Sequence, residues 1–392
     1  MIGIGTFILS LALSYVGTLL LLRVHSMRRF VDVPNQRSSH EVPKLRLGGI
    51  AIVGSFAVVL TILFAVAPGM EMFLPLVLGA MIIFGAGVLD DFRSLHPAFR
   101  FAAQLLAAGI VVGFGHVVEG IYLPLVGTID LGVAALPFTV LFIVTSINFF
   151  NFVDGIDGLA AGSAFIAAGF IAIIAFMVGH APLGYLCLAI SGSSLGFLQF
   201  NIPPSRLFMG DSGSTFLGFC FGLIAVVGDG LAPRIPFFIP VLILSSLYLD
   251  AGLTLIMRAI RGEKIFQAHR THYYQRLLQL GLNHKQVTAL EYGLTVMLGI
   301  SAIVYFRAGG FFPVLLTLCW VTIFTFLILK IRSLERGDRL LWERRTVLVV
   351  ASDLILIAAA YFGAYFVRMN FRFTDPEGIA VLKAFPVVLV IR

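Results

Sequence analysis

One stretch decides what fold this chain can adopt: Val133-Ala-Ala-Leu-Pro-Phe-Thr-Val-Leu-Phe-Ile-Val-Thr-Ser-Ile-Asn148-Phe-Phe-Asn151-Phe-Val-Asp154-Gly-Ile-Asp157-Gly158. Residues 132–150 are mostly apolar, and a helix of about 20 apolar residues crosses the hydrocarbon core of a bilayer. Two amides and two carboxylates then follow at a spacing of three residues. Polar groups at the mouth of such a helix cost free energy and add no packing, so they are usually functional. The stretch predicts a membrane-spanning helix that ends in a functional polar turn.

The composition agrees with a membrane protein. Of the 392 residues, 59% are hydrophobic and 12% are charged, and the mean hydropathy is +1.01. Soluble domains are about half apolar and about a quarter charged. The composition therefore excludes a disordered chain, a coiled coil and a nucleic-acid-binding module, and we expect no nucleic acid partner. Cys187, Cys220 and Cys319 lie in apolar runs and are interpreted as packing residues.

Apolar runs of similar length recur along the chain. The predicted fold class is all-α: a polytopic transmembrane helical bundle of about 10–11 core helices with one or more extra C-terminal spans. We expect residues 1–330 to form the membrane-embedded domain. Residues 331–392 are expected to form a cytoplasmic linker and extra spans, interpreted as the start of a truncated fused domain. The runs cover residues 2–22, 48–68, 72–89, 100–115, 132–150, 158–179, 183–200, 213–229, 235–257, 287–306, 310–330 and 346–367.

The basic residues orient the predicted bundle. With the N-terminus placed outside, most of the 27 Lys and Arg residues fall in loops on the inner side. Cytoplasmic loops of membrane proteins are enriched in these residues. We therefore expect the N-terminus outside and the inner loops in the cytoplasm. Residues 116–131 combine Gly and Pro with alternating apolar residues, a pattern that predicts a small hairpin at the outer interface.

The unusual polar residues gather in five loops, and the order of the helices places all five loops on the inner face. The third of these loops contains the polar turn quoted above. Because the loops are far apart in sequence but share one face, we expect their side chains to meet in one cytoplasmic cleft. The loops are residues 32–49, 90–95, 148–158, 201–214 and 269–276.

Five carboxylates from these loops can meet there: Asp90, Asp91, Asp154, Asp157 and Asp211. Carboxylates brought together repel one another unless a cation lies among them. Oxygen ligands with few histidines favour Mg²⁺, with Mn²⁺ as the alternative. Because Mg²⁺ commonly binds substrate phosphates, the cluster predicts a phosphorylated substrate.

Glycine turns and basic residues support this interpretation. The turns at 154–158 and 210–214 are expected to begin helices whose backbone N–H groups bind an anion. Phosphoryl transfer depends mainly on positioning and on charge stabilisation, which a metal ion and basic side chains supply. The basic candidates for phosphate binding are Arg37, Lys44, Arg46 and Arg206.

Each of these signals also has a structural interpretation. Asp90 and Asp91 could cap a helix, the 210–214 turn could be an N-cap only, and His269 and His272 could be polar surface residues. A secondary transporter is the alternative function. Transporters, however, place polar residues near the membrane midplane, whereas these residues lie at helix mouths on one side.

Five motifs, in this order, resemble the polyprenyl-phosphate N-acetylhexosamine-1-phosphate transferase family over residues 1–330. The resemblance implies transfer of an N-acetylhexosamine 1-phosphate from a UDP-sugar to undecaprenyl phosphate in the membrane lipid, with release of UMP. It also implies a Mg²⁺-dependent enzyme that initiates O-antigen or related polysaccharide synthesis, and it leaves open a homodimer. The motifs are Asp-x-Pro-x-x-Arg-x-x-His (32–40), Leu-Gly-Gly (47–49), Asp90-Asp91, Asn-x-x-Asn-x-x-Asp-Gly-x-Asp-Gly-Leu (148–159) and Met-Gly-Asp-Ser-Gly-Ser (209–214).

The same resemblance implies a role for each motif residue. Asp90 would deprotonate the lipid phosphate or attack the donor phosphate, and Asp211 with Asp154 would bind the metal. Phe208 would stack on the uracil ring. Many relatives carry consecutive histidines in the fifth loop, whereas His272 is followed here by Tyr-Tyr-Gln. The chain resembles the O-antigen-initiating branch more than the peptidoglycan enzyme. The implied catalytic residues are Asp90, Asp91, Asp154 and His272, and the implied substrate-binding residues are Arg37, His40, Lys44, Arg46, Asn148, Asn151, Asp157, Arg206, Phe208 and His269.

Overall fold

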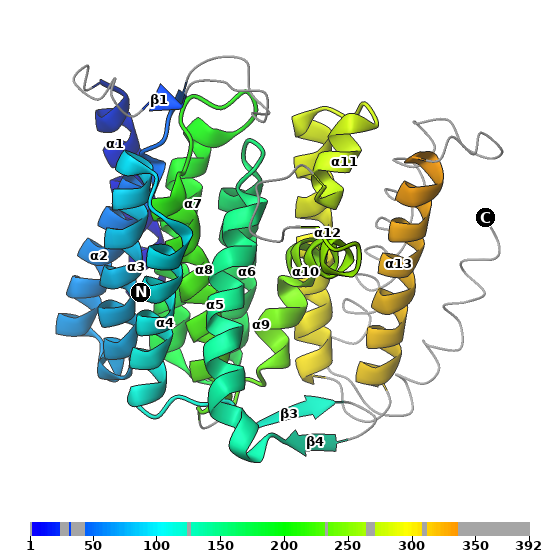
Figure 1. The fold of residues 1–392 in the computed structure, drawn as a ribbon. Helices are drawn as coiled ribbons and strands as arrows, with labels where there is room; N and C mark the ends of the chain where they lie inside the picture. Colours follow the sequence, from blue (N-terminus) through cyan, green and yellow to red (C-terminus); the bar gives the residue numbers. More distant parts are fainter. Residues whose placement is uncertain are drawn as a thin grey trace, which may run out of the picture.

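The computed structural model describes residues 2–23, 31–32, 44–123, 127–231, 234–263, 271–307 and 312–335. These residues form a helical bundle with two short hairpins, which confirms the all-α prediction (Figure 1). The helices are α1 (Ile2–Arg23), α2 (Gly48–Val66), α3 (Leu74–Arg93), α4 (Pro97–Gly113), α5 (Ala135–Val153), α6 (Leu159–Met177), α7 (Ala181–Asn201), α8 (Asp211–Asp229), α9 (Phe238–Ile243), α10 (Ser245–Ile260), α11 (Tyr273–Gln279), α12 (His284–Arg307) and α13 (Phe312–Glu335).

Two short 3-10 helices, Met70–Phe73 and Gly132–Ala134, precede α3 and α5. Among the described residues, eight helical segments are long and apolar enough to cross a membrane, and α4 is a shorter apolar helix. The chain is therefore a multi-pass membrane protein. Two further expectations stay predictions: the outside location of the N-terminus and the domain boundary after residue 330, which falls near the end of α13. The predicted span at 346–367 lies outside the described residues.

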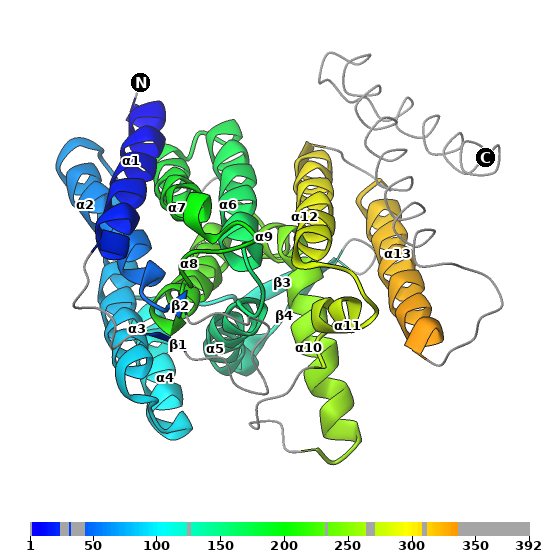
Figure 2. The same ribbon diagram turned by 90° about the horizontal axis from the view of Figure 1, so that it is seen from above.

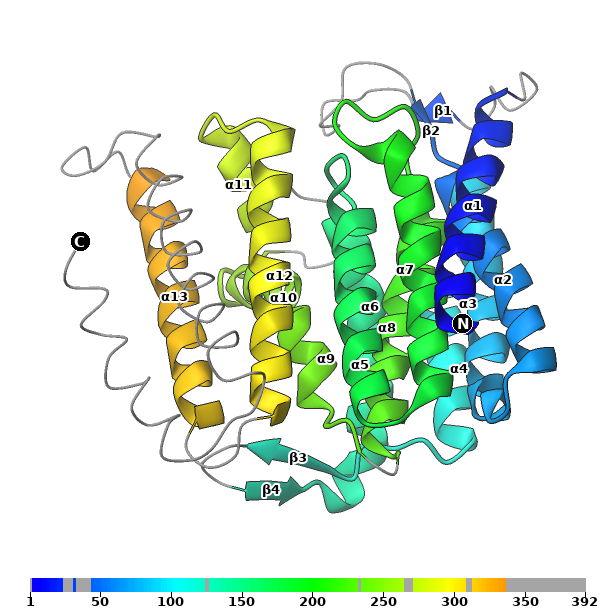
Figure 3. The same ribbon diagram turned by 180° about the vertical axis from the view of Figure 1, so that it is seen from behind.

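The centre of the bundle is α8. Every residue of α8 except Asp211 and Thr215 is buried, because α8 packs against α2, α3 and α5. Figure 3 shows α8 enclosed by the other helices, with α2, α3 and α4 on one flank and α12 and α13 on the other. A helix surrounded on all sides has no lipid-facing stripe, so apolar and small residues occur all round it.

One predicted span is broken. Residues 235–257 were expected to form a single helix, but the structure divides this run into α9 and α10 at Leu244 (φ −94°, ψ 7°). Figure 1 shows α10 nearly end-on, whereas Figure 2 shows its full length, so α10 runs across the direction of its neighbours. Pro240 has no amide hydrogen to give to the helix, and the chain leaves helical geometry one turn after it. The sequence expectation of one continuous span was wrong here.

Both hairpins are antiparallel. β1 (Val31–Asp32) pairs with β2 (Lys44–Leu45), and β3 (Gly120–Leu123) pairs with β4 (Gly127–Asp130). The second pair confirms the hairpin predicted within 116–131. Figure 1 places the two hairpins at opposite ends of the bundle, with β1 at the end where α8 begins and β3–β4 at the end where α8 finishes.

Small residues let α1 approach α7 closely. Four hydroxyl residues of α1 recur every fourth position and face α7, and three of them hydrogen-bond to the carbonyl four residues earlier. On α7, a Cβ added to Gly196 would lie 2.9 Å from Cβ of Ser14 and would overlap the carbonyl oxygen of Leu11. Small residues at such contacts allow membrane helices to pack backbone to backbone. The four α1 residues are Thr6, Ser10, Ser14 and Thr18.

We predict that Gly196→Ala destabilises the protein by about 1–3 kcal/mol, because the new methyl group meets a backbone atom that cannot rotate away. The matched control is Gly54→Ala on α2, where an added Cβ meets nothing within 4 Å. The control should be neutral or slightly stabilising, since alanine favours the helix. Thermal unfolding of both variants in the same detergent gives the comparison. Equal melting temperatures for the two variants would contradict the close approach of α1 to α7.

Candidate functional site

The predicted inner loops meet at one end of the bundle. The carboxyl-terminal ends of α3, α5 and α7 lie beside the amino-terminal ends of α2 and α8, at the end carrying β1 in Figure 1. Main-chain hydrogen bonds join the segments directly: Gly48 N donates to Phe208 O (2.9 Å), and Gly49 N donates to Met209 O (2.7 Å). The convergence expected from helix order is therefore present in the described part of the chain.

The start of α8 is bound by the side chain of Asp91. Its Oδ1 accepts the backbone N–H of Asp211 (2.8 Å), and its Oδ2 accepts that of Ser212 (3.0 Å). The first N–H groups of a helix have no partner within the helix, and a carboxylate there is also favoured by the helix dipole. The expectation that these N–H groups bind a substrate anion was wrong, because the carboxylate of the protein itself occupies them. A catalytic role for Asp91 stays a prediction.

Glycines allow this contact. Gly210 has φ +76°, and a Cβ there would lie 2.7 Å from Asp91 Oδ2. A Cβ on Gly87 of α3 would lie 2.6 Å from Cα of Ser212, and one on Gly49 of α2 would lie 2.7 Å from Cα of Gly213. Both distances are too short for a real side chain. Helices α2 and α3 therefore reach the backbone at the start of α8 only because these positions lack side chains.

Asp90 and Asp211 share a partner. Arg100 Nη1 lies 3.1 Å from Asp90 Oδ2 and 3.7 Å from Asp211 Oδ2. On the other side of Asp211, Oδ1 accepts Asn151 Nδ2 at 2.9 Å and lies 3.6 Å from Arg46 Nη2. The Asp90 side chain is only 7% exposed, whereas the side chains of Arg46 and Arg100 are about two-fifths exposed. The arrangement places two carboxylates of low exposure (7% for Asp90 and 17% for Asp211) beside guanidinium groups that solvent can reach.

Asp154 belongs to the same electrostatic cluster. It ends α5 as the C-cap residue. Burial raises the pKa of the Asp154 carboxyl well above its usual range, and the nearby Arg46 guanidinium opposes this shift. The negative charges of Asp211, Asp91 and Asp157 raise the pKa of Asp154 further. Such crowding of acids is what a divalent cation would relieve.

The side chain of Asp157 hydrogen-bonds to neighbouring loop residues of the protein. Its carboxylate accepts Ser205 N (2.9 Å), Ser205 Oγ (2.7 Å) and Lys44 Nζ (3.4 Å). The Lys44 ammonium also lies 4.9 Å from the centre of the Phe208 ring, a cation–π contact. These contacts tie the 154–158 turn to the loop before α8. Substrate roles for Lys44, Asp157 and Phe208 stay predictions.

The two asparagines at the end of α5 have different partners. Asn151 contacts Asp211, as described above, and also donates to Ser214 Oγ (2.9 Å). Asn148 instead faces α4, where it exchanges hydrogen bonds with Gln104 (2.7 and 3.3 Å). Paired side-chain amides of this kind join α4 to α5 within the membrane. The structure thus brings Asn151 to the carboxylate cluster and gives Asn148 a partner away from it.

His272 lies at the start of α11 and is buried. Its Nδ1 is 3.3 Å from Asp250 Oδ1, and its ring lies 5.6 Å from the Phe152 ring. No contact to Asp90 or Asp211 is seen among its described interactions. Arg206 is exposed on the loop before α8. Three further predicted residues lie outside the described residues: Arg37, His40 and His269.

Sequence reasoning missed two residues of this region. Arg100 counted only as one of the basic residues on the inner side, although its position one turn into α4 faces the end of α3. Asp250 was absorbed into the apolar run 235–257, although a lone carboxylate within such a run is itself a signal of function. Arg100 contacts Asp90 and Asp211, and Asp250 contacts His272. Both missed residues therefore lie beside side chains that the sequence had predicted to be functional.

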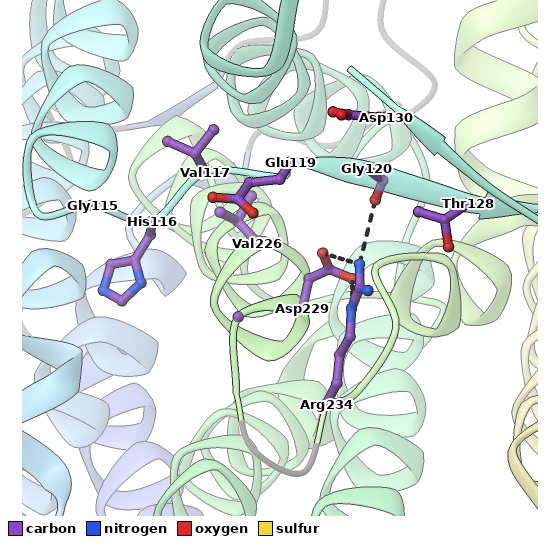
Figure 4. Close-up of a pocket in the computed structure, with 11 residues that line it drawn as sticks. Gly115, His116, Val117, Glu119, Gly120, Thr128, Asp130, Val226, Asp229 and Arg234 are labelled. Carbon is purple, nitrogen blue, oxygen red and sulfur yellow. Dashed lines mark hydrogen bonds and ion pairs between the residues drawn. The ribbon is translucent and has the colours of Figure 1, made fainter. Parts of the chain in front are cut away.

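The cavity drawn in Figure 4 lies elsewhere. It has a volume of about 670 Å³ and lies beside the β3–β4 hairpin, at the end of α8 opposite Asp211. Asp229 forms an ion pair with Arg234 there (2.6 Å), and Arg234 also contacts the carbonyl of Gly120. The charges of Asp229 and Arg234 therefore already compensate each other within the protein. The cavity contains none of the predicted site residues.

The donor set fits a Mg²⁺ ion. Among the described residues, no three His, Cys, Asp or Glu side chains are grouped closely enough to hold a metal ion alone. Mg²⁺ does not require such a group, because it usually takes one or two carboxylates and completes its shell with water and phosphate oxygens. Asp211 and its neighbours offer oxygen ligands and excess negative charge, and no thiolate lies among them.

Comparison with known proteins agrees with this site. Residues 73–229, which contain most of the cluster, match glycosyl transferase family 4. A probable undecaprenyl-phosphate N-acetylglucosaminyl 1-phosphate transferase of Bacillus subtilis is 33% identical over 330 residues, covering 83% of this chain and 88% of the relative. The decaprenyl-phosphate N-acetylglucosaminephosphotransferase of Mycobacterium leprae is 33% identical over 71% of this chain and 77% of its own length. A phospho-N-acetylmuramoyl-pentapeptide-transferase of Clostridium kluyveri is 31% identical over 44% of this chain and 52% of its own length.

The identity to these relatives extends well beyond the cluster, over most of the described bundle. The motifs, the carboxylate site at one end of the bundle and the matched segments therefore lead to one assignment: the chain belongs to glycosyl transferase family 4.

Proposed function

We propose that this protein transfers an N-acetylhexosamine 1-phosphate from a UDP-sugar to undecaprenyl phosphate, releasing UMP. The reaction takes place at the cytoplasmic face of the bacterial inner membrane and initiates O-antigen or related cell-envelope polysaccharide synthesis. The names of the relatives favour N-acetylglucosamine as the sugar. The observation that carries the proposal is the pairing of Asp90 and Asp211 with Arg100 at the end of the bundle where the motifs meet.

The reaction exchanges one phosphoanhydride bond for another. A phosphate oxygen of the lipid attacks the phosphorus that bears the sugar, and the bond from this phosphorus to the UMP oxygen breaks. Asp90 is the group we assign to accept the proton of the lipid phosphate. Its carboxylate is nearly enclosed and is held by Leu95 N–H (2.5 Å) and Arg100, so it keeps a fixed orientation. An enclosed base with fixed partners needs little reorganisation during the proton transfer.

Asp211 and Asp154 are the residues that would hold Mg²⁺. The ion would neutralise phosphate charge as the bond to UMP breaks. Asn151 orients Asp211 through the 2.9 Å hydrogen bond to Oδ1. Arg46 and Arg100 expose guanidinium groups beside the same carboxylate, where they can bind the phosphates of donor and acceptor.

The position of the cluster argues against the transporter alternative. Transporters bind substrate near the membrane midplane between broken helices. Here Asp90, Asp154 and Asp211 lie at helix ends, on one side of the bundle. A lipid-linked acceptor explains why the site belongs to a membrane protein, since the phosphate of a prenyl lipid is held at the membrane surface.

The direct test measures transfer of label from UDP-[³H]N-acetylglucosamine to undecaprenyl phosphate by the purified protein in detergent micelles. We expect a lipid-soluble product and UMP in equal amounts, only when Mg²⁺ or Mn²⁺ is present. A panel of UDP-N-acetylhexosamines then identifies the preferred sugar. Absence of product with every donor, by protein that is folded, would refute the proposed activity.

We predict that Asp211→Asn lowers kcat by about 100-fold or more, because a metal-binding carboxylate and a fixed charge are lost together. The Mg²⁺ concentration for half-maximal activity should rise as well. The matched control is Asp130→Asn, which changes an exposed carboxylate on β4 at the opposite end of the bundle. An unchanged Mg²⁺ titration for Asp211→Asn would contradict its role as a ligand.

We predict that Arg100→Gln lowers kcat/KM by roughly 10- to 100-fold, the effect of losing a hydrogen bond to a charged group worth about 1.5–3 kcal/mol. Arg93→Gln is the control, since Arg93 is an exposed arginine at the end of α3. Initial rates at varied lipid and donor concentrations show which phosphate Arg100 binds. Equal kcat/KM values for the two variants would remove Arg100 from the site.

A further inference from the structure

The Asp250 carboxylate contacts three groups at the start of α11. It lies on α10 and is 8% exposed. Its Oδ1 accepts Tyr273 N (2.8 Å) and lies 3.3 Å from His272 Nδ1, and its Oδ2 accepts Tyr274 N (3.0 Å). One carboxylate thus binds the first two amides of α11 and the ring of the preceding histidine. A buried carboxylate on an apolar helix is costly unless it has such partners.

Two aromatic rings pack near the His272 ring. The His272 ring is stacked against the Tyr274 ring (5.7 Å, 11° between planes) and lies 5.6 Å from the Phe152 ring. The Asp250 carboxylate is an acceptor only, so a neutral His272 ring can hydrogen-bond to it only with the ring hydrogen on Nδ1. The other ring nitrogen, Nε2, then carries the lone pair. The contact with Asp250 therefore favours this tautomer and one orientation of the ring.

The same unit is attached to the carboxylate cluster. The hydroxyl of Tyr274 donates to Phe152 O (2.8 Å), two residues before Asp154. Gly155 lies directly under this hydroxyl, and a Cβ at that position would overlap it. Burial raises the pKa of the Tyr274 hydroxyl, and the negative charges of Asp250 and Asp154 raise it further. The start of α11 therefore contacts the turn that carries Asp154.

We propose that Asp250 is a positioning residue for the transferase reaction, which holds His272 as the Nδ1-protonated tautomer beside the Asp154 turn and so makes Nε2 the hydrogen-bond acceptor of the site. This inference rests on the proposed function. It assigns a task to a carboxylate that no motif includes, and it gives a physical reason for His272 to be functional without neighbouring histidines. Asp250 itself contacts no substrate.

The test is a double-mutant cycle on the full-length protein with the undecaprenyl phosphate assay. We expect Asp250→Asn to lower kcat by about 10- to 100-fold, as loss of a carboxylate behind a functional histidine commonly does, and to change KM for both substrates less than threefold. In a His272→Gln background, Asp250→Asn should cause no further loss. Multiplicative losses, or an unchanged kcat in Asp250→Asn, would overturn the proposal.

A matched control separates positioning from stability. Asp229 is also 8% exposed and also accepts a backbone amide, Phe237 N at 2.7 Å, but at the opposite end of the bundle. Asp229→Asn should lower the melting temperature about as much as Asp250→Asn and leave kcat unchanged. If the two variants lose kcat in proportion to their melting temperatures, the role of Asp250 is structural only, and the proposal fails.

A second measurement needs neither activity nor a folded Asp250 variant. In ¹⁵N-histidine-labelled wild-type protein, the His272 signal is assigned as the one missing from His272→Gln. We expect the chemical shifts of a ring protonated at Nδ1. The Nε2-protonated tautomer would falsify the proposal. Because this spectrum does not depend on the substrates, it distinguishes failure of the Asp250 inference from failure of the proposed function, which the transfer assay of the wild type tests.

Discussion

The hydrogen bonds from the start of α8 to Asp91 are the interaction on which the rest of the site depends. A buried helix must find partners for its first N–H groups, and α8 is buried along nearly its whole length. Asp91 supplies both oxygens from α3. With this end fixed, the side chain of Asp211 lies between Arg100, Arg46 and Asn151. The need of α8 for partners to its first N–H groups thereby determines where the charged side chains lie.

Charge balance is the second constraint. Asp90, Asp154 and Asp211 come from the ends of three helices, and like charges brought together in this way repel one another unless they are compensated. The compensating groups also come from separate segments, with Arg46 before α2 and Arg100 in α4. Because these two guanidinium groups are partly exposed, they can exchange a carboxylate for a phosphate without being removed from water completely. A site of this composition is suited to anionic substrates that arrive and leave.

The sequence was sufficient to predict the all-α class, the placement of most spans, the hairpin within 116–131 and the meeting of Asp90, Asp91 and Asp211. The lengths of the apolar runs predict the spans. Successive loops must lie on alternating sides of the membrane, so the order of the spans predicts which loops share a face. Partner choice is different, since it depends on which side chains meet across helices. The amino-acid sequence alone does not show that Asn148 pairs with Gln104 whereas Asn151 contacts Asp211. The contacts of Asp250 likewise depend on where α10 lies relative to the start of α11.

The neighbouring residues Asp90 and Asp91 have separate tasks. Side chains of successive residues in a helix point about 100° apart, so one carboxylate holds α8 while the other contacts Arg100. Neither can be in place unless α3 has its correct rotation and depth. A chain that has inserted incompletely therefore cannot display a competent centre. Formation of this arrangement is therefore itself a check on assembly.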